Sequence, residues 1–187
     1  MHTEYEVRIL DINRDELIEK LEKVGALFQW DLIQKRFVYD FIPKEDNKWI
    51  RLRTNGEKTT LTIKNLTSSS IDGTQELEIE VDNFERCNLI LKELGYNPRG
   101  YQENRRRQYI LNGVEIDIDS WPKIPDYLEI EGPSEEAVFN TLEYLGFKRE
   151  DATTRDVEGI FLDYGFNLQE IYDLKLEEER KWQIVKN

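Results

Sequence analysis

Polar residues, nearly all of them ionisable, occupy every second position in seven short segments of this chain, and apolar residues fill most positions between them. The segments are Glu4-Tyr5-Glu6-Val7-Arg8, Arg51-Leu52-Arg53, Thr60-Leu61-Thr62-Ile63-Lys64, Glu76-Leu77-Glu78-Ile79-Glu80, Arg105-Arg106-Arg107, Glu115-Ile116-Asp117-Ile118-Asp119 and Glu129-Ile130-Glu131. Residues two apart on a strand point to one face, roughly 6.6 Å apart, so two such carboxylates reach one divalent ion. This pattern favours a strand face that binds metal ions together with a polyanion.

The acidic segments hold more carboxylates than one ion needs, and unpaired carboxylates facing one another repel and take up protons. Cations must therefore neutralise them. The candidate metal ligands are Glu4, Glu6, Glu76, Glu78, Asp117, Asp119, Glu129 and Glu131, and Glu80 belongs to the same acidic face. The candidate anion-binding cations are Arg8, Arg51, Arg53, Lys64, Arg105 and Arg107. Arginine suits phosphate because its planar fork matches two oxygens at once.

A solvated sheet face with cross-strand ion pairs is the alternative interpretation. For a single pair such as Arg51 and Arg53 it is the better one. For all seven segments together we prefer a charged lining, because a wet face would carry more Lys, Ser and Gln and would mix the two signs within each strand. An ion-pair network buried without a ligand is also disfavoured, since its desolvation cost is seldom recovered.

Composition limits the chemistry further. The 187 residues fit one domain, 1–187, with a C-terminal helical tail from about residue 157. The net charge of −13 argues against nucleic-acid duplex as a partner. Cys87 and His2 are the only residues of their types, so a metal site must use oxygen ligands, which favours Mg²⁺ or Mn²⁺. No stretch predicts a membrane span or signal peptide, so we expect a cytoplasmic protein.

The order of predicted elements suggests how the charged segments are positioned. We expect strands near 3–10, 34–42, 49–54, 58–65, 75–82, 104–111, 114–120 and 126–131. Asn55-Gly56 and Asn112-Gly113 are hairpin signals. We expect helices near 13–24 and 83–94 and a third that starts after 132–134 and ends at Gly146. These helices would cover the apolar faces of the strands.

The order and spacing of these segments resemble the CYTH superfamily, also called triphosphate tunnel metalloenzymes. Glu4-Tyr5-Glu6-Val7-Arg8 looks like the family's E-x-E-x-K, Arg51-Leu52-Arg53 like its R-x-R, and Lys64 like the lysine of the next strand. The later acidic and basic segments also match in order, up to about residue 131. The resemblance implies an α+β fold: an eight-stranded antiparallel β-barrel with an open tunnel and outer helices. It also implies a bound triphosphate, Mg²⁺ or Mn²⁺ on the carboxylates, and a homodimer.

Three positions concern how closely this chain follows the family pattern. Position 8 is arginine where the family usually has lysine, and arginine cannot act as a base. We expect Arg8 to hold phosphate while a metal-bound water or a nearby glutamate, with Glu78 and Glu80 as candidates, supplies the nucleophile. Arg36 stands where family members often have an acidic residue. Arg155 lies roughly where a late basic residue contacts phosphates in some members, and an ordinary surface arginine is an equally good interpretation.

The resemblance leaves three functions open. The first is a metal-dependent hydrolase of tripolyphosphate, thiamine triphosphate or a nucleoside triphosphate. The second is a class IV adenylate cyclase, and such members tend to carry His-Phe shortly before E-x-E-x-K, whereas Met1-His2-Thr3 precedes Glu4 here. The third is a non-catalytic binder of polyphosphate or nucleotides. The expected partner is in each case a small-molecule phosphate compound.

Overall fold

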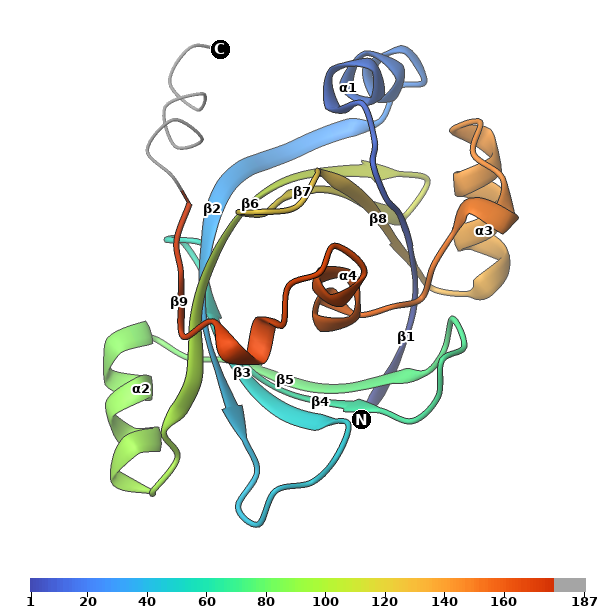
Figure 1. The fold of residues 1–187 in the computed structure, drawn as a ribbon. Helices are drawn as coiled ribbons and strands as arrows, with labels where there is room; N and C mark the ends of the chain where they lie inside the picture. The colour runs from blue at the N-terminus through green and yellow to red at the C-terminus, as the bar shows by residue number, and fades with distance from the viewer. Residues whose placement is uncertain (177–187) are drawn as a thin grey trace.

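A closed antiparallel barrel forms the centre of the molecule in the computed structural model, which describes residues 1–176 (Figure 1). Its strands are β1 (His2–Ile9), β2 (Leu27–Asp40), β3 (Lys48–Thr54), β4 (Thr59–Leu66), β5 (Thr74–Glu80), β6 (Pro98–Leu111), β7 (Val114–Ser120) and β8 (Tyr127–Gly132). Their order is β2-β3-β4-β5-β1-β8-β7-β6, and the pairing of β2 with β6 closes the ring. The expected eight-stranded antiparallel barrel is therefore confirmed.

Alternation along each strand separates a charged lumen from an apolar outer surface. On β1, for example, Val7 and Ile9 belong to the outer apolar core, while Glu4, Glu6 and Arg8 line the internal cavity. The hairpin at Asn112-Gly113 sets the register of β6 and β7. Both residues have positive φ, 52° and 82°, as a two-residue turn of type I′ requires.

Two strands are longer than the sequence pattern predicts. β2 begins at Leu27 rather than near 34, and β6 begins at Pro98 rather than near 104. These two strands pair with each other from Leu27–Ile110 to Tyr39–Pro98. Their extra residues do not alternate cleanly in the sequence, since their strand structure depends on pairing with a distant partner.

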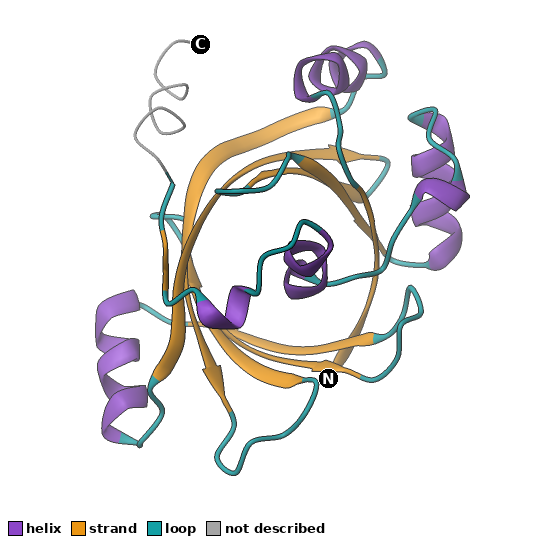
Figure 2. Cartoon of the chain, in the orientation of Figure 1, coloured by secondary structure: helices purple, strands orange, loops and turns teal. Residues whose placement is uncertain are grey.

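Three helices cover the outside of the barrel, as expected (Figure 2). They are α1 (Arg14–Lys23), α2 (Phe84–Glu93) and α3 (Glu135–Tyr144), and Asn13, Asn83 and Ser134 cap their N-termini. Apolar residues of α1 and α3 pack with those of β1, β6, β7 and β8, and α2 packs against β2 and β3. Among residues 1–176, no helix is long and apolar enough to cross a membrane.

The C-terminal segment differs from the single helical tail that the sequence predicts. It forms a 3₁₀ turn η1 (Arg149–Asp151), α4 (Val157–Asp163), a second turn η2 (Leu168–Glu170) and the two-residue strand β9 (Asp173–Leu174), which pairs in parallel with β6. Gly165, with φ of +81°, follows α4 and redirects the chain. The part of the predicted tail from 177 to 184 lies outside the described residues.

This segment also changes the expected open tunnel, because α4 and η2 lie over one end of the barrel in the axial view (Figure 1). They bring Ile160, Phe161 and Leu168 against Trp121, Ile124 and Tyr127. We call these six residues the plug cluster. Phe161 is fully buried and meets the Trp121 ring edge-on at 5.7 Å. The lumen is therefore covered at this end by an apolar seal.

Truncation of the Phe161 side chain should lower the stability of the protein. We expect Phe161→Ala to lower the free energy of unfolding by about 3–5 kcal/mol, because it leaves a cavity in the plug cluster. The adjacent Leu162 is 59% exposed, so Leu162→Ala should change it by less than about 0.5 kcal/mol. Urea denaturation measures both. Equal effects of the two substitutions would show that α4 does not seal the barrel as described.

Candidate active site

The lumen contains a cavity of about 300 Å³. Asp156, Val157 and Leu168 of the C-terminal segment border it at the plugged end. A neighbouring hollow of about 270 Å³ shares Trp30, Arg53 and three other lining residues with it and continues to the β3–β4 turn. The volume suits a small ligand rather than a polymer.

Basic side chains project inward from one contiguous half of the barrel, formed by β6, β2, β3 and β4. They are Arg106, Arg36, Arg51, Arg53 and Lys64. Lys64 Nζ lies 2.9 Å from Glu4 and 3.0 Å from Glu76. Arg53 is weakly engaged, since its one ion pair among residues 1–176, to Glu78, measures 4.0 Å. This basic wall therefore retains donors that its protein partners do not fully use.

Acidic side chains project inward from the other half, formed by β5, β1, β8 and β7. They are Glu76, Glu78, Glu4, Glu6, Glu129, Glu131, Glu115, Asp117 and Asp119. Asp117 and Asp119 are buried behind Arg106, whose guanidinium lies 2.6 Å from each carboxylate and 2.9 Å from Glu129. The acidic side chains outnumber the inward-facing cations, so the lumen is acidic overall.

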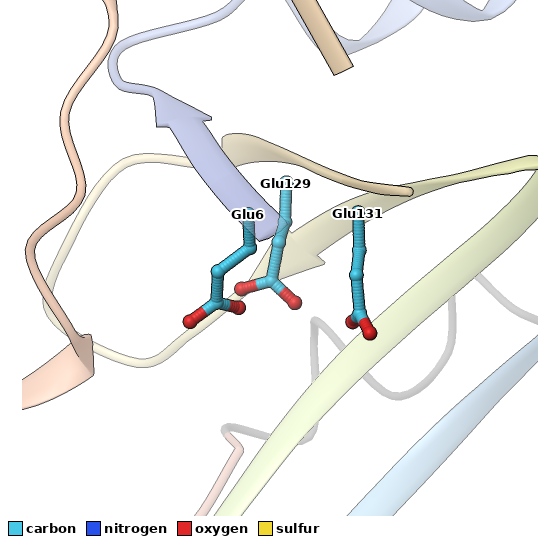
Figure 3. Close-up of side chains that lie close together, drawn as sticks. All are labelled: Glu6, Glu129 and Glu131. Carbon is cyan, nitrogen blue, oxygen red and sulfur yellow. The ribbon is translucent and has the colours of Figure 1, made fainter. Parts of the chain in front are cut away.

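Three of these carboxylates form a cluster that fits a cation. Glu6, Glu129 and Glu131 each offer an oxygen, and the three oxygens lie within 4.8 Å of one another. Glu6 pairs with Glu131 across the β1–β8 ladder, and Glu129 lies two residues before Glu131 (Figure 3). All-oxygen ligands on rigid strands suit Mg²⁺ or Mn²⁺.

Several acidic groups in the lumen hold their protons more tightly than usual. Burial, together with Glu6 and Glu129, raises the pKa of Glu131 to about 7. Burial raises the pKa of Glu4 to about 8 although Lys64 opposes the shift, and burial raises that of Asp117 to about 7 against Arg106. These shifts have the sign expected for carboxylates that have too few cations.

Other acidic groups are shifted in the opposite direction. Burial alone would raise the pKa of Glu129, but Arg8 and Arg106 outweigh it and hold this pKa well below its usual range. Lys64 and Arg51 likewise lower the pKa of Glu76 to about 2. Glu129 and Glu76 are therefore ionised at neutral pH.

Arg8 lies in the acidic half and is already fully engaged. Its Nε donates to Glu129 at 2.7 Å, its Nη2 to Glu6 at 2.8 Å and its Nη1 to the backbone carbonyl of Arg155 at 2.8 Å. The side chain is buried, and although burial opposes it, Glu129 and Glu6 raise its pKa above the ordinary value. Phosphate contact by Arg8, as expected from the sequence, would have to share or replace these partners.

Most predicted site residues meet in this cavity. Those that line it are Glu4, Glu6, Arg8, Arg51, Arg53, Lys64, Glu76, Glu78, Glu129 and Glu131. Asp117 and Asp119 reach it only through Arg106.

Besides Asp117 and Asp119, four predicted residues do not line the cavity. Arg105 and Arg107 lie on the outer face of β6, next to Asp31. Arg105 donates hydrogen bonds to the Asp31 carboxylate from Nε at 2.6 Å and from Nη2 at 2.7 Å, and Arg107 donates one from Nη1 at 3.2 Å. Glu80 is exposed and pairs with Lys58 at 2.6 Å. The side chain of Arg155 is exposed and pairs with Asp163. The structure thus removes Arg105 and Arg107 from the lumen, because strand alternation sends them outward.

Arg106 is the inward-facing arginine that sequence reasoning missed. The sequence did contain the information that would have identified it. A two-residue turn at Asn112-Gly113 pairs Leu111 with Val114, and the same antiparallel register then pairs Arg106 with Asp119. Directly opposed residues share a face, so an inward Asp119 implies an inward Arg106. Trp30, Gln34 and Gln108, which also line the cavity, carry no comparable signal.

Fold and site together define a protein with a closed barrel whose lumen pairs a cation-binding acidic wall with an anion-binding basic wall. The CYTH domain model matches residues 2–156, and the chain therefore belongs to the CYTH family. Proteins of this family bind triphosphate substrates and typically use divalent metals.

Individual relatives are similar at low identity. A curated Methanocaldococcus jannaschii protein named "Putative adenylate cyclase MJ0240" is 24% identical over 132 residues, which cover 68% of this chain and 75% of that protein. The structure of the PH1012 protein from Pyrococcus horikoshii OT3 matches with a TM-score of 0.71 at 27% identity, covering 82% of this chain and 96% of that one.

A third match is a Hippeastrum structure, "Putative adenylyl cyclase HpAC1", described as revealing a dominant triphosphatase activity. Its TM-score is 0.58 at 18% identity, and the match covers 91% of this chain and all of that one. At this identity the match shows a shared fold.

The raised pKa values predict how the stability of the metal-free protein, in the presence of a chelator, depends on pH. A carboxyl group whose pKa is raised on folding stabilises the protein below its unfolded value of 4.5, and this stabilisation is lost as the pH rises through the folded values of about 7 for Glu131 and about 8 for Glu4. Glu129, with its lowered pKa, destabilises the fold only below about pH 4.5. The melting temperature should therefore fall by several degrees from about pH 5 to about pH 8.

Differential scanning fluorimetry with and without Mg²⁺ measures this dependence. Added Mg²⁺ should restore the melting temperature at about pH 8 and have little effect at about pH 5, because it competes with protons. Glu131→Gln should flatten the pH dependence, whereas Glu135→Gln on the exposed first turn of α3 should not. A melting temperature that does not change between these pH values would contradict the assignment.

Proposed function

We propose that this protein is a divalent-metal-dependent hydrolase of a triphosphate compound, such as tripolyphosphate, thiamine triphosphate or a nucleoside triphosphate. The observation that carries the proposal is the division of one cavity into a basic and an acidic wall. A triphosphate alone would be repelled by the excess of carboxylates, and a metal ion alone would not need the basic wall. A triphosphate together with divalent ions complements both.

Arg51, Arg53 and Arg106 supply planar guanidinium groups for the phosphoryl oxygens. Lys64 adds a point charge at the boundary with Glu4 and Glu76. Arg-phosphate contacts of this kind hold the chain of phosphates in one orientation and stabilise charge that moves during transfer.

The cluster of Glu6, Glu129 and Glu131 is the set that would hold Mg²⁺ or Mn²⁺. A bound divalent ion supplies charge neutralisation and lowers the pKa of water. Arg8 acts here as a positioning residue, because its Nε and Nη2 orient two of the three carboxylates.

Glu78 is the glutamate we assign to positioning the attacking water. Thr62 Oγ1 donates to Glu78 Oε2 at 2.7 Å, and Arg51 lies 3.4 Å from the same oxygen. These contacts fix its carboxylate at the edge of the basic wall, where a second oxygen stays available to accept a proton. Glu80 is not retained in this role because it lies at the exposed end of β5, paired with Lys58, and does not line the cavity.

An adenylate cyclase is the second candidate, favoured by the name of the M. jannaschii relative. In that reaction the ribose 3′-oxygen of ATP replaces water and pyrophosphate leaves. Trp30, which lines both the cavity and the adjoining hollow, offers a ring on which a base could stack.

A substrate panel separates these functions. We expect orthophosphate release from at least one of tripolyphosphate, ATP and thiamine triphosphate in the presence of Mg²⁺ or Mn²⁺, and none in a chelator. Malachite green detects phosphate, and chromatography detects cyclic AMP. Formation of cyclic AMP and pyrophosphate would show a cyclase rather than a hydrolase. Tight binding without turnover would contradict both functions.

Neighbouring arginines on β6 provide a matched pair of variants. Arg106→Lys keeps the charge but loses the planar fork that spans Asp117, Asp119 and phosphate, so kcat/KM should fall by at least about tenfold. Arg107→Lys changes an outward residue that contacts Asp31, and kcat/KM should stay within about twofold. The opposite ranking, measured on the best substrate of the panel, would show that the outer face of β6 takes part.

A further inference from the structure

Arg36 is a buried cation that forms no ion pair with any residue among 1–176. It is 6% exposed and lines the cavity, and its Nη2 donates to two neutral oxygens, Oε1 of Gln34 and Oδ1 of Asn104. Within the described part of the chain, its Nε has no hydrogen-bond partner. Among residues 1–176, no carboxylate oxygen lies within 4.0 Å of its guanidinium nitrogens, whereas the other inward arginines each have at least one such contact.

Its surroundings make this burial costly. Arg36 is directly opposite Arg53 in the β2–β3 ladder, and like charges in such positions repel. Burial, then Arg53, Arg51 and Arg106, lower the pKa of Arg36 well below its ordinary value, and they outweigh the opposing effect of Asp119. Arginine nevertheless stays protonated, so the repulsion remains in the ligand-free protein.

Neighbouring groups orient the guanidinium without neutralising it. The Trp121 ring lies 4.6 Å from its Cζ atom, and Asn104 relays its Oδ1 contact to Asp119, to which Asn104 Nδ2 donates at 2.6 Å. A stacked, hydrogen-bonded guanidinium is held in one plane, with its Nε still free. This fixed orientation preorganises Arg36 for binding an anion, because little side-chain entropy remains to be lost on binding.

We propose that Arg36 and Arg53 together form an anion subsite that contacts a phosphoryl group of the substrate directly, beside the plug cluster. The inference rests on the proposed function and deepens it. Because Trp121 belongs to the apolar seal, this end of the cavity suits an unsubstituted terminal phosphate. An organic substituent would then extend toward Trp30 and the β3–β4 turn, where the adjoining hollow lies.

The test compares Arg36→Gln with Lys35→Gln, its exposed neighbour on the opposite face of β2. In the ligand-free protein, Arg36→Gln should melt at the wild-type temperature or above, because it removes repulsion from Arg53. With Mg²⁺ and tripolyphosphate at low temperature, its affinity by calorimetry should fall roughly 10- to 100-fold, the range for one charge-assisted contact. Lys35→Gln should change neither quantity, and Arg36→Lys should recover part of the affinity.

Wild-type affinity of Arg36→Gln for tripolyphosphate would overturn the subsite. If that affinity came with a lowered melting temperature of the ligand-free variant, Arg36 would be an internal brace instead. Failure of the proposed function looks different, because the wild type would then hydrolyse none of the triphosphate compounds, whether or not it binds them. In that case, binding of pyrophosphate in the presence of a metal chelator still tests the subsite. If pyrophosphate raises the melting temperature of the wild type more than that of Arg36→Gln, the subsite is supported, and equal increases refute it.

Discussion

Charged side chains on the inner face of a closed barrel must be neutralised there, and the rest of this structure depends on that constraint. The ladder between β2 and β6 closes the sheet and removes the lining from bulk water. Desolvated charges are costly unless they have partners. Internal ion pairs offset part of that cost. Lys64 pairs with Glu4 and Glu76, and Arg106 pairs with Asp117, Asp119 and Glu129.

Neutralisation is incomplete on both walls, and in opposite senses. Burial and neighbouring carboxylates raise the pKa values of Glu131 and Glu4, while burial and neighbouring arginines lower the pKa values of Arg36 and Arg53. Burial pushes the pKa of Arg53 down to about 10, still far enough above neutrality for a permanent charge. Each wall would therefore gain from a counter-ion of a different sign, and binding energy that relieves such strain adds to the stability of the folded state.

The sequence predicts the eight strands and most inward carboxylates because alternation is a local property of each strand. It fails where position depends on pairing. The three arginines 105–107 have no apolar residue between them, so only the β6–β7 register shows that Arg106 points inward. The plug is likewise invisible in the sequence, since Ile160 and Phe161 fit any amphipathic helix, and their partners Trp121 and Tyr127 are distant in the chain.

Arginine at position 8 is explained by the plug as much as by the site. One planar group joins Glu129, Glu6 and the carbonyl of Arg155, which immediately precedes the capping residue Asp156 of α4. The β-bridge between Arg8 and Thr153 fixes the same segment through the backbone. A lysine carries a single nitrogen and has no rigid fork to span three acceptors that lie in different directions. The guanidinium thus couples the geometry of the acidic cluster to closure of the barrel end, so a replacement that loosens either contact must disturb both.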